Sequence, residues 1–289
     1  MNLYQEIRPS IRRFYFLLLR AIPQTLATLY SKIFYQLAVD LLPLDKFSSQ
    51  LSFLFNYEKN VILERFGGSS DGGYFCPPNI ANIKYVFSPG HGGIKTFEDH
   101  MSLLGKQVYM CDPDFKLVED LKKHQEFDSI GISSTEIRKD NFMTLENWVN
   151  SKVGIDSNNL LLQMDIEGQE WEIFASSDSM FLNRFEVMIV EFHGLDRMLY
   201  DSHFASLTKV SLSKLSSSHS NAFCKANNVG GYVYFKGKKF PKVIECTLIR
   251  HNSSLLTIDV DTKRRDAKCD YRNNANMPPL AIPRLRLLQ

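Results

Sequence analysis

Residues 160–171 have the sequence Leu160-Leu-Leu-Gln-Met-Asp-Ile-Glu-Gly-Gln-Glu-Trp171, and this stretch decides the fold class. Its first five positions are almost entirely apolar, which is typical of a strand buried on both faces of a parallel sheet. Asp165 ends the apolar run, and a helical pattern follows from about Glu167. In an open α/β sheet, ligands bind in the crevice outside the carboxyl ends of the strands. We therefore expect the functional site around Asp165.

Short apolar runs alternate with helical patterns on both sides of this stretch. The expected strands cover 84–88, 107–111, 127–132, 160–164 and 185–192, and the expected helices cover 96–104, 115–124, 145–153, 167–175 and 204–215. This order predicts an α/β domain with a Rossmann-like, mostly parallel sheet and helices on both faces. A strand near 222–225 and a hairpin over 231–250, turning at 236–239, predict an antiparallel pair at one edge.

The length of 289 residues suits one such domain with an additional segment at each end. We expect an N-terminal helical segment over 1–55, the Rossmann-like domain over 56–256 and an extended tail over 257–289. The tail is expected to be extended because it combines closely grouped prolines with scattered arginines.

The N-terminal segment carries an apolar stripe. Apolar residues between Leu26 and Leu42 recur at helical spacing after Pro23, which predicts a helix whose stripe must be covered. The stripe could pack on the domain, on a second copy of the chain, or on a membrane surface through residues 11–42. Arginines upstream of Pro23 suit a membrane surface, whereas a polar face that carries only Lys32 and Asp40 argues against it.

The composition limits the classes of function. A net charge of +2 argues against a nucleic-acid-binding protein, which usually carries a concentrated basic face. The five cysteines are widely spaced and form no CxxC pair, so free thiols are expected rather than disulfides or a zinc site. The sequence contains no uninterrupted run of about 18 apolar residues, so a membrane-spanning helix is not predicted. We expect a cytoplasmic protein, with membrane association as the alternative.

A glycine-rich turn and an acidic residue indicate a nucleoside cofactor. Ser88-Pro-Gly-His-Gly-Gly93 follows the first expected strand, and its glycines let backbone N–H groups approach a ligand closely. Asp112 ends the next strand about twenty residues later, where an acid accepts hydrogen bonds from ribose hydroxyls. Because Lys95 occupies the third position of a GxGxxG pattern, an ordinary turn remains the alternative.

Longer stretches of the chain resemble a known family. They are Arg65-Phe-Gly-Gly68, Asp71-Gly-Gly-Tyr74, Phe87 to Gly93 with Phe97-Glu98, Cys111-Asp-Pro113, Met164 to Trp171, and Val190-Glu-Phe-His193. Over about residues 61–250 the chain is similar to the S-adenosylmethionine-dependent methyltransferases of the FkbM-like group. The resemblance implies a class I methyltransferase domain and O-methylation of a small molecule or sugar. In a departure from the family, Lys225-Ala-Asn-Asn228 stands where relatives often have His-x-Asn-Asn.

The expected cofactor site combines the glycine turn with residues near it. Gly90, Gly92 and Asp112 should hold S-adenosylmethionine. Asp71 and Tyr74 belong to a tight turn from which Tyr74 can reach over the cofactor, and Glu167 should also lie close. A helix-capping role for Asp165 and Glu167 is the alternative, because acidic residues are favoured at helix N-termini.

The expected catalytic residues follow the central strands. Methyl transfer from a sulfonium requires alignment of the acceptor and removal of its proton. His193, flanked by Glu191, is the predicted general base, since histidine titrates near neutrality. Asp165 and Lys225 complete the catalytic set, with Asn228 and His219 near it.

A second mechanism uses a divalent metal. Asp165, Glu191 and Asn227 offer the hard oxygen ligands that Mg²⁺ or Mn²⁺ prefers. Alternatively, the segment from Asn227 to Gly231 forms only a turn, because Asn and Gly tolerate left-handed backbone angles.

The polar character of the expected site predicts a sugar, nucleotide-sugar or glycan hydroxyl as acceptor, because an apolar acceptor would leave buried polar groups unpaired. Two alternatives stay open: a Rossmann-fold nucleotide-sugar oxidoreductase, and a non-catalytic binding module with the methyltransferase fold.

Overall fold

The computed structural model describes residues 48–55, 61–115, 120–135, 141–199, 201–235, 238–256 and 272–282. The predicted helix over 23–42 lies outside these residues, as does most of the predicted tail over 257–289. Among the described residues, no helix is both long enough and apolar enough to cross a membrane. The four described cysteines are buried free thiols.

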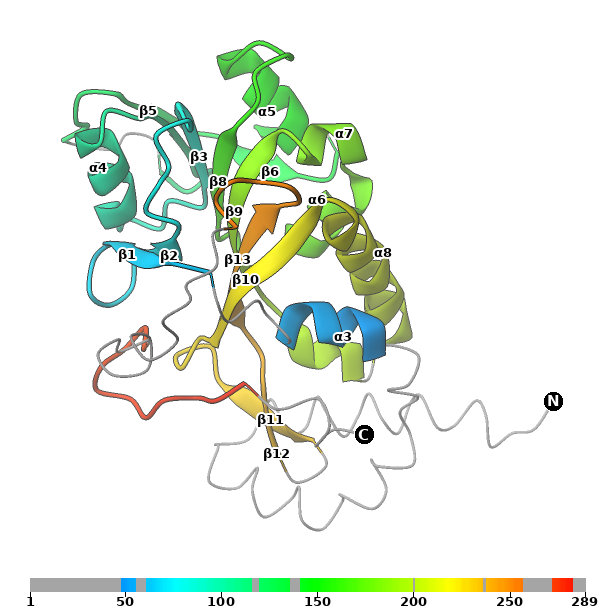
Figure 1. The fold of residues 1–289 in the computed structure, drawn as a ribbon. Coiled ribbons are helices and arrows are strands. Elements are labelled where there is room, and N and C mark those ends of the chain that lie inside the picture. The colour runs from blue at the N-terminus through cyan, green and yellow to red at the C-terminus, as the bar shows by residue number, and fades with distance from the viewer. Residues whose placement is uncertain are drawn as a thin grey trace.

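A seven-stranded sheet forms the centre of the fold, with the strand order β10-β13-β9-β8-β3-β4-β5 (Figure 1). Its five consecutive parallel strands are β3 (Tyr85–Pro89), β4 (Gln107–Cys111), β5 (Gln125–Asp128), β8 (Leu160–Met164) and β9 (Phe185–Phe192). In chain order these strands lie 3-2-1-4-5, as in doubly wound α/β folds, and the order reverses between β3 and β8. The prediction of a mostly parallel α/β sheet is confirmed.

The antiparallel edge is also confirmed, but different strands form it. β13 (Ile244–Arg250) lies antiparallel between β9 and β10 (His219–Ala226). The predicted hairpin over 231–250 is therefore too long. A hairpin forms between β11 (Tyr232–Phe235) and β12 (Lys238–Pro241), which make a small separate sheet, and the rest of the range contains β13 of the main sheet. β13 is buried along almost its whole length, which suits an interior position, whereas β12 begins with two exposed lysines.

Helices and a hairpin cover the two faces of the sheet. The helices are α3 (Ser48–Phe55), α4 (Thr96–Leu103), α5 (Leu145–Lys152), α6 (Glu170–Ser176), α7 (Ser179–Leu182) and α8 (Ser202–Ser218), with a 3₁₀ helix η3 (Leu195–Leu199). The hairpin consists of β1 (Glu64–Gly67) and β2 (Gly73–Cys76). Figure 1 shows α4 and this hairpin on one side of the sheet and α3, α6 and α8 on the other.

Two hydrophobic clusters follow this division. On β9, Val187 and Ile189 join the cluster that contains Tyr74 and Phe97, whereas Met188 joins the cluster beneath the helices α6 and α8. Successive side chains of a strand point to opposite faces, so the two clusters lie on opposite faces of the sheet. The parallel strands are thus buried on both sides, as their continuous apolar runs predict.

Three expected elements differ from the structure. The strand expected over 127–132 is divided between β5 and β6 (Gly131–Ser133), and β6 pairs with β7 (Phe142–Thr144) outside the main sheet. Of the helix expected over 115–124, residues 116–119 lie outside the described part, and 120–124 form no helix because Asp120 and His124 have positive φ angles. The helix expected from Glu167 begins only at Glu170, since Glu167 and Gly168 also have positive φ angles.

Candidate active site

A cavity of about 320 Å³ opens at the carboxyl ends of β3, β4 and β8. This is the point where the strand order reverses, the place where open α/β sheets bind ligands. Its volume falls in the range of ligand pockets, roughly 300–1,000 Å³. The predicted residues Gly90, Gly92, Asp112, Asp165 and Glu167 all line it.

The glycine turn forms one wall of the cavity. Gly90 has a φ of +89°, and a Cβ atom there would lie 1.6 Å from the backbone oxygen of Asp165. The turn is held on the other side by the Gly90 N–H, which donates to Cys111 O at 2.9 Å. His91, also in the turn, is held by its buried ring, which packs edge-on against Phe115 and Phe127. Because any side chain at position 90 would clash with Asp165, only glycine allows the ends of β3 and β8 to approach this closely.

Asp112 is fixed at the opening of the turn. Its Oδ2 accepts a hydrogen bond from Gly92 N at 3.1 Å, and its Oδ1 accepts one from Asp114 N at 2.9 Å. A carboxylate has about four lone-pair sites, so each oxygen can accept a further hydrogen bond. Apolar side chains share the cavity with Asp112: Phe115, Ile130, Ile132, Phe142 and Ile166. An acid beside apolar walls suits a ribose next to a planar base.

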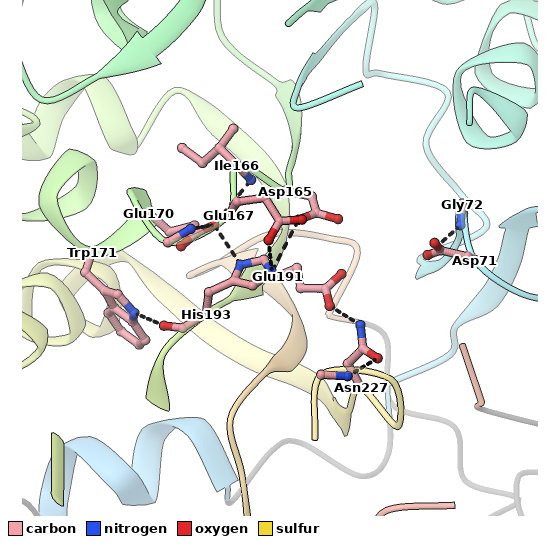
Figure 2. A network of polar contacts seen from close by, with 12 residues as sticks. Asp71, Gly72, Asp165, Ile166, Glu167, Glu170, Trp171, Glu191, His193 and Asn227 are labelled. Carbon is pink, nitrogen blue, oxygen red and sulfur yellow. Dashed lines mark hydrogen bonds and ion pairs between the residues drawn. The ribbon is translucent and has the colours of Figure 1, made fainter. Parts of the chain in front are cut away.

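A histidine surrounded by carboxylates lies beside the cavity (Figure 2). His193 follows β9, and its Nδ1 lies 3.0 Å from Glu170 Oε1. Its Nε2 lies 3.7 Å from Asp165 Oδ1 and 3.5 Å from Glu167 Oε2. Asp165, Glu170 and His193 each offer one potential ligand atom within 4.8 Å of the others. The structure thus brings together residues from the ends of β8 and β9, as predicted for parallel strands.

Glu170 organises this cluster, a role that was not predicted from the sequence. The side chain is fully buried, and its Oε1 also accepts hydrogen bonds from Ile166 N at 3.2 Å and Gly168 N at 3.1 Å. Next to it, Trp171 Nε1 donates to the backbone oxygen of His193 at 2.7 Å. The spacing of an acid five residues after Asp165, at the start of a helix, is the signal that indicates this role.

The environment of the cluster shifts the pKa values of two members. Burial alone would lower the pKa of His193, but the hydrogen bond and charge of Glu170, followed by the charge of Asp165, raise it to about 9. Burial, followed by the charge of Glu191, raises the pKa of Asp165 to about 9. At neutral pH His193 therefore holds a proton, and it must lose that proton before it can act as the predicted base.

Charged residues continue across the neighbouring strands. Glu191 of β9 is opposite Glu245 of β13, and Glu245 is opposite Lys225 of β10. Lys225 Nζ lies 3.0 Å from Glu245 Oε2, and both side chains are buried. Burial raises the pKa of Glu245 to about 6, although Lys225 opposes this shift. Lys225 is thus engaged in an internal ion pair, and its catalytic role stays a prediction.

Asn227 and Asn228 have separate partners. Asn227 Nδ2 donates to Glu191 Oε1, and its Oδ1 accepts from Val229 N and Gly230 N. The Asn227 amide oxygen thus already has two donors, and the metal-ligand set of Asp165, Glu191 and Asn227 stays a prediction. Asn228 instead holds the C-terminal segment, donating to the backbone oxygens of 274 and 277 and accepting from the backbone N–H of 274.

No model of a known protein family and no curated protein matches this chain.

Three of the predicted residues lie away from the cavity. Tyr74 is buried and packs edge-on against Phe97, with ring centroids 5.4 Å apart, so its ring lies inside the fold. Burial, and then the charge of Asp165, raises the pKa of Tyr74. Asp71 is exposed, accepts from Gly72 N at 3.1 Å, and is separated from the histidine cluster in Figure 2. Neither residue lines the cavity, and their cofactor role stays a prediction.

His219 is the third, and its expected position near the acceptor is wrong. It is the first residue of β10, which runs in the same direction as β9. His219 therefore lies at the amino ends of these strands, whereas the site lies at the carboxyl ends of β8 and β9. Its Nε2 lies 3.0 Å from the backbone oxygen of Phe185, the first residue of β9.

Proposed function

We propose that the protein is an S-adenosylmethionine-dependent O-methyltransferase that acts on a hydroxyl of a sugar, glycan or other polar small molecule. The observation that carries the proposal is the cavity between β3 and β8, with Asp112 fixed at its rim. The sequence resemblance over about residues 61–250 supports the same assignment.

The residues of the cavity fit this cofactor. The unused lone pairs of Asp112 suit the two ribose hydroxyls, and Ile132, Phe142 and Ile166 suit the faces of an adenine ring. The backbone around Gly90 and Gly92 would lie beneath the methionine portion. When bound, S-adenosylmethionine supplies a methyl group on a sulfonium that is already activated for transfer. The chain's own task is then to bind and align the acceptor.

The acceptor side is polar. Asp165 and Glu167 line the cavity, and Glu191 and His193 lie next to Asp165. An apolar acceptor would cover Asp165 and Glu167, which line the cavity, without offering them partners, at a cost of roughly 1 to 3 kcal/mol each. A hydroxyl-rich acceptor such as a sugar supplies both donors and acceptors, which favours it over a lipid or an aromatic ring.

Two features disfavour a nucleotide-sugar oxidoreductase. Lys95 replaces the third glycine of the dinucleotide pattern, and the antiparallel β13 lies where a dinucleotide-binding sheet continues with a parallel strand.

Binding followed by transfer tests the proposal. Calorimetry on the full chain should show one molecule of S-adenosylmethionine bound per chain and no nicotinamide dinucleotide. The radiolabelled methyl donor should then label members of a panel of glycans and sugar nucleotides. Binding of the dinucleotide alone would favour an oxidoreductase, and binding of neither would favour a non-catalytic module. Methyl transfer only to protein or nucleic acid would contradict the assignment.

A further inference from the structure

The geometry points to a divalent-cation site at the rim of the cavity, formed by Asp165, His193 and Glu167. Its role in catalysis rests on the proposed methyltransferase function, but its existence does not. The oxygens Asp165 Oδ1 and Glu167 Oε2 face the same nitrogen, His193 Nε2, at 3.7 and 3.5 Å. Ligand atoms around one cation, each roughly 2.1 Å from it, lie about 3 to 4 Å apart.

The other side of the histidine ring has the support that metal-binding histidines need. A histidine that binds a metal usually donates its second ring N–H to a carboxylate, which fixes the tautomer and the ring orientation. Glu170 Oε1, 3.0 Å from Nδ1, provides this partner, and two backbone N–H groups hold the same oxygen in place. Nε2 is consequently the nitrogen that is directed toward Asp165 and Glu167.

Unpaired oxygens are the second, independent observation. Asp165 Oδ1 and Glu170 Oε2 are buried atoms that accept no hydrogen bond within the described part of the chain. Asp165 Oδ1 is the one of the two that faces His193 Nε2, the nitrogen assigned to the cation. Buried polar atoms in native structures nearly always have a partner, and missing partners indicate an unseen water or ion.

The balance of charge favours a cation over water. Asp165, Glu167 and Glu170 surround His193, and Glu191 lies beside Asp165. A cation bound at His193 Nε2 would replace the proton that the ring otherwise holds among these carboxylates. The neighbouring Lys225 is already paired with Glu245. Oxygen ligands together with one imidazole suit Mn²⁺ well, and Mg²⁺ accepts the same oxygens. Both Asp165 and Glu167 line the cavity, so an acceptor oxygen could complete the coordination shell.

Manganese binding to the full chain tests the site without cofactor or acceptor. Calorimetry and the loss of the free Mn²⁺ resonance signal should show one ion bound per chain. Glu167→Gln should weaken the affinity at least tenfold, and Asp165→Asn and His193→Gln at least as much. The exposed side chain of Glu167 makes its variant the one most certain to fold. Glu172→Gln, which changes an exposed carboxylate on the helix α6 that follows Glu167, is the matched control and should bind like the wild type.

Two outcomes would overturn the site: no binding at millimolar Mn²⁺, or equal affinity in Glu167→Gln and Glu172→Gln. Full methyl transfer by protein shown to contain no metal would overturn the role of the cation in catalysis and leave the methyltransferase proposal standing. Conversely, a cation bound with the expected variant pattern, in a protein that does not bind S-adenosylmethionine, would support the site and overturn the proposed function.

Discussion

Glu170 Oε1 lies 3.0 Å from His193 Nδ1, and this contact joins the loop after β8 to the loop after β9. The same oxygen accepts two backbone hydrogen bonds from the loop between Asp165 and Glu170, where Glu167 and Gly168 have positive φ angles. One buried carboxylate thus determines both the shape of the loop and the orientation of the histidine. The rest of the site is arranged around this pair.

Replacing Glu170 should lower the pKa of His193. The hydrogen bond and charge of Glu170 raise that pKa to about 9 against the opposing effect of burial. In Glu170→Gln the charge is lost, so the pKa should fall from about 9 toward the usual value of about 6.5, with Asp165 and Glu191 still raising it. A titration of the His193 ring followed by NMR, in the presence of a chelator, measures this. Glu172→Gln serves as the control, and a His193 pKa that stays near 9 in Glu170→Gln would contradict the assignment.

The same shift predicts how stability depends on pH. A histidine whose pKa is higher in the folded state stabilises the fold fully below its unfolded pKa of about 6.5. That contribution is lost as pH rises through about 9. Chemical unfolding at several pH values should show this loss in the wild type and a smaller one in His193→Gln. Parallel pH curves for the two proteins would show that His193 does not contribute.

Asp112 should be necessary for cofactor affinity. Asp112→Ala removes charge-assisted hydrogen bonds worth roughly 1.5 to 3 kcal/mol, so S-adenosylmethionine should bind about tenfold or more weakly. Calorimetry on the folded variant measures the change. Asp71→Ala tests the other acidic residue predicted near the cofactor, and its distance from the cavity leads us to expect unchanged affinity. Equal effects of the two substitutions would remove Asp112 from the site.

The sequence predicts those parts of the site that follow from the pattern of apolar residues within one strand and from the residues that end it. The strands β8 and β9 have the expected bounds because both are buried on two faces and read as continuous apolar runs. The positions of Gly90 and Asp112 follow from the ends of such strands. Because parallel strands end at one edge of the sheet, the proximity of Asp165 and His193 could be predicted as well.

The contacts that depend on distant segments could not be predicted. Glu191 precedes His193 closely in sequence, yet Glu170 is the carboxylate that holds the ring, because the loop after β8 turns back through positive φ angles. Glu245 was not expected at all. It reaches Glu191 because β13 inserts between β9 and β10, and apolar periodicity does not reveal the order of strands in a sheet.

Two glycines of the same turn should differ in their tolerance of alanine. In Gly90→Ala the new Cβ would lie 1.6 Å from a backbone oxygen of Asp165, so the strands must separate, at a cost of roughly 3 kcal/mol or more. In Gly92→Ala the nearest atom is 4.0 Å away, and only the positive φ is unfavourable, at about 1 to 2 kcal/mol. Urea unfolding compares the two variants. A larger loss of stability in Gly92→Ala would show that the turn packs differently.

Glu98 should make the protein less stable as pH rises toward neutrality. This fully buried side chain on α4 lies 2.5 Å from Ser88 Oγ, which lies 2.5 Å from Gln163 Oε1. A hydroxyl has one proton and can donate only one of these bonds, so a protonated Glu98 supplies the other. Burial raises the pKa of Glu98 to about 7, against the opposing effect of the Ser88 hydrogen bond.

The direction in which pH changes the folding stability follows from this pKa shift. The unfolded carboxyl loses its proton near pH 4.5, whereas the folded one keeps it up to about pH 7. Folding stability should therefore fall between these pH values, by on the order of 3 kcal/mol. Glu98→Gln keeps the shape without the titration, so relative to the wild type it should gain stability of that order between pH 4.5 and pH 8. Urea unfolding at both pH values measures the difference, with Glu172→Gln as an exposed control. A difference between Glu98→Gln and wild type that does not change with pH would mean that Glu98 is not the group that titrates.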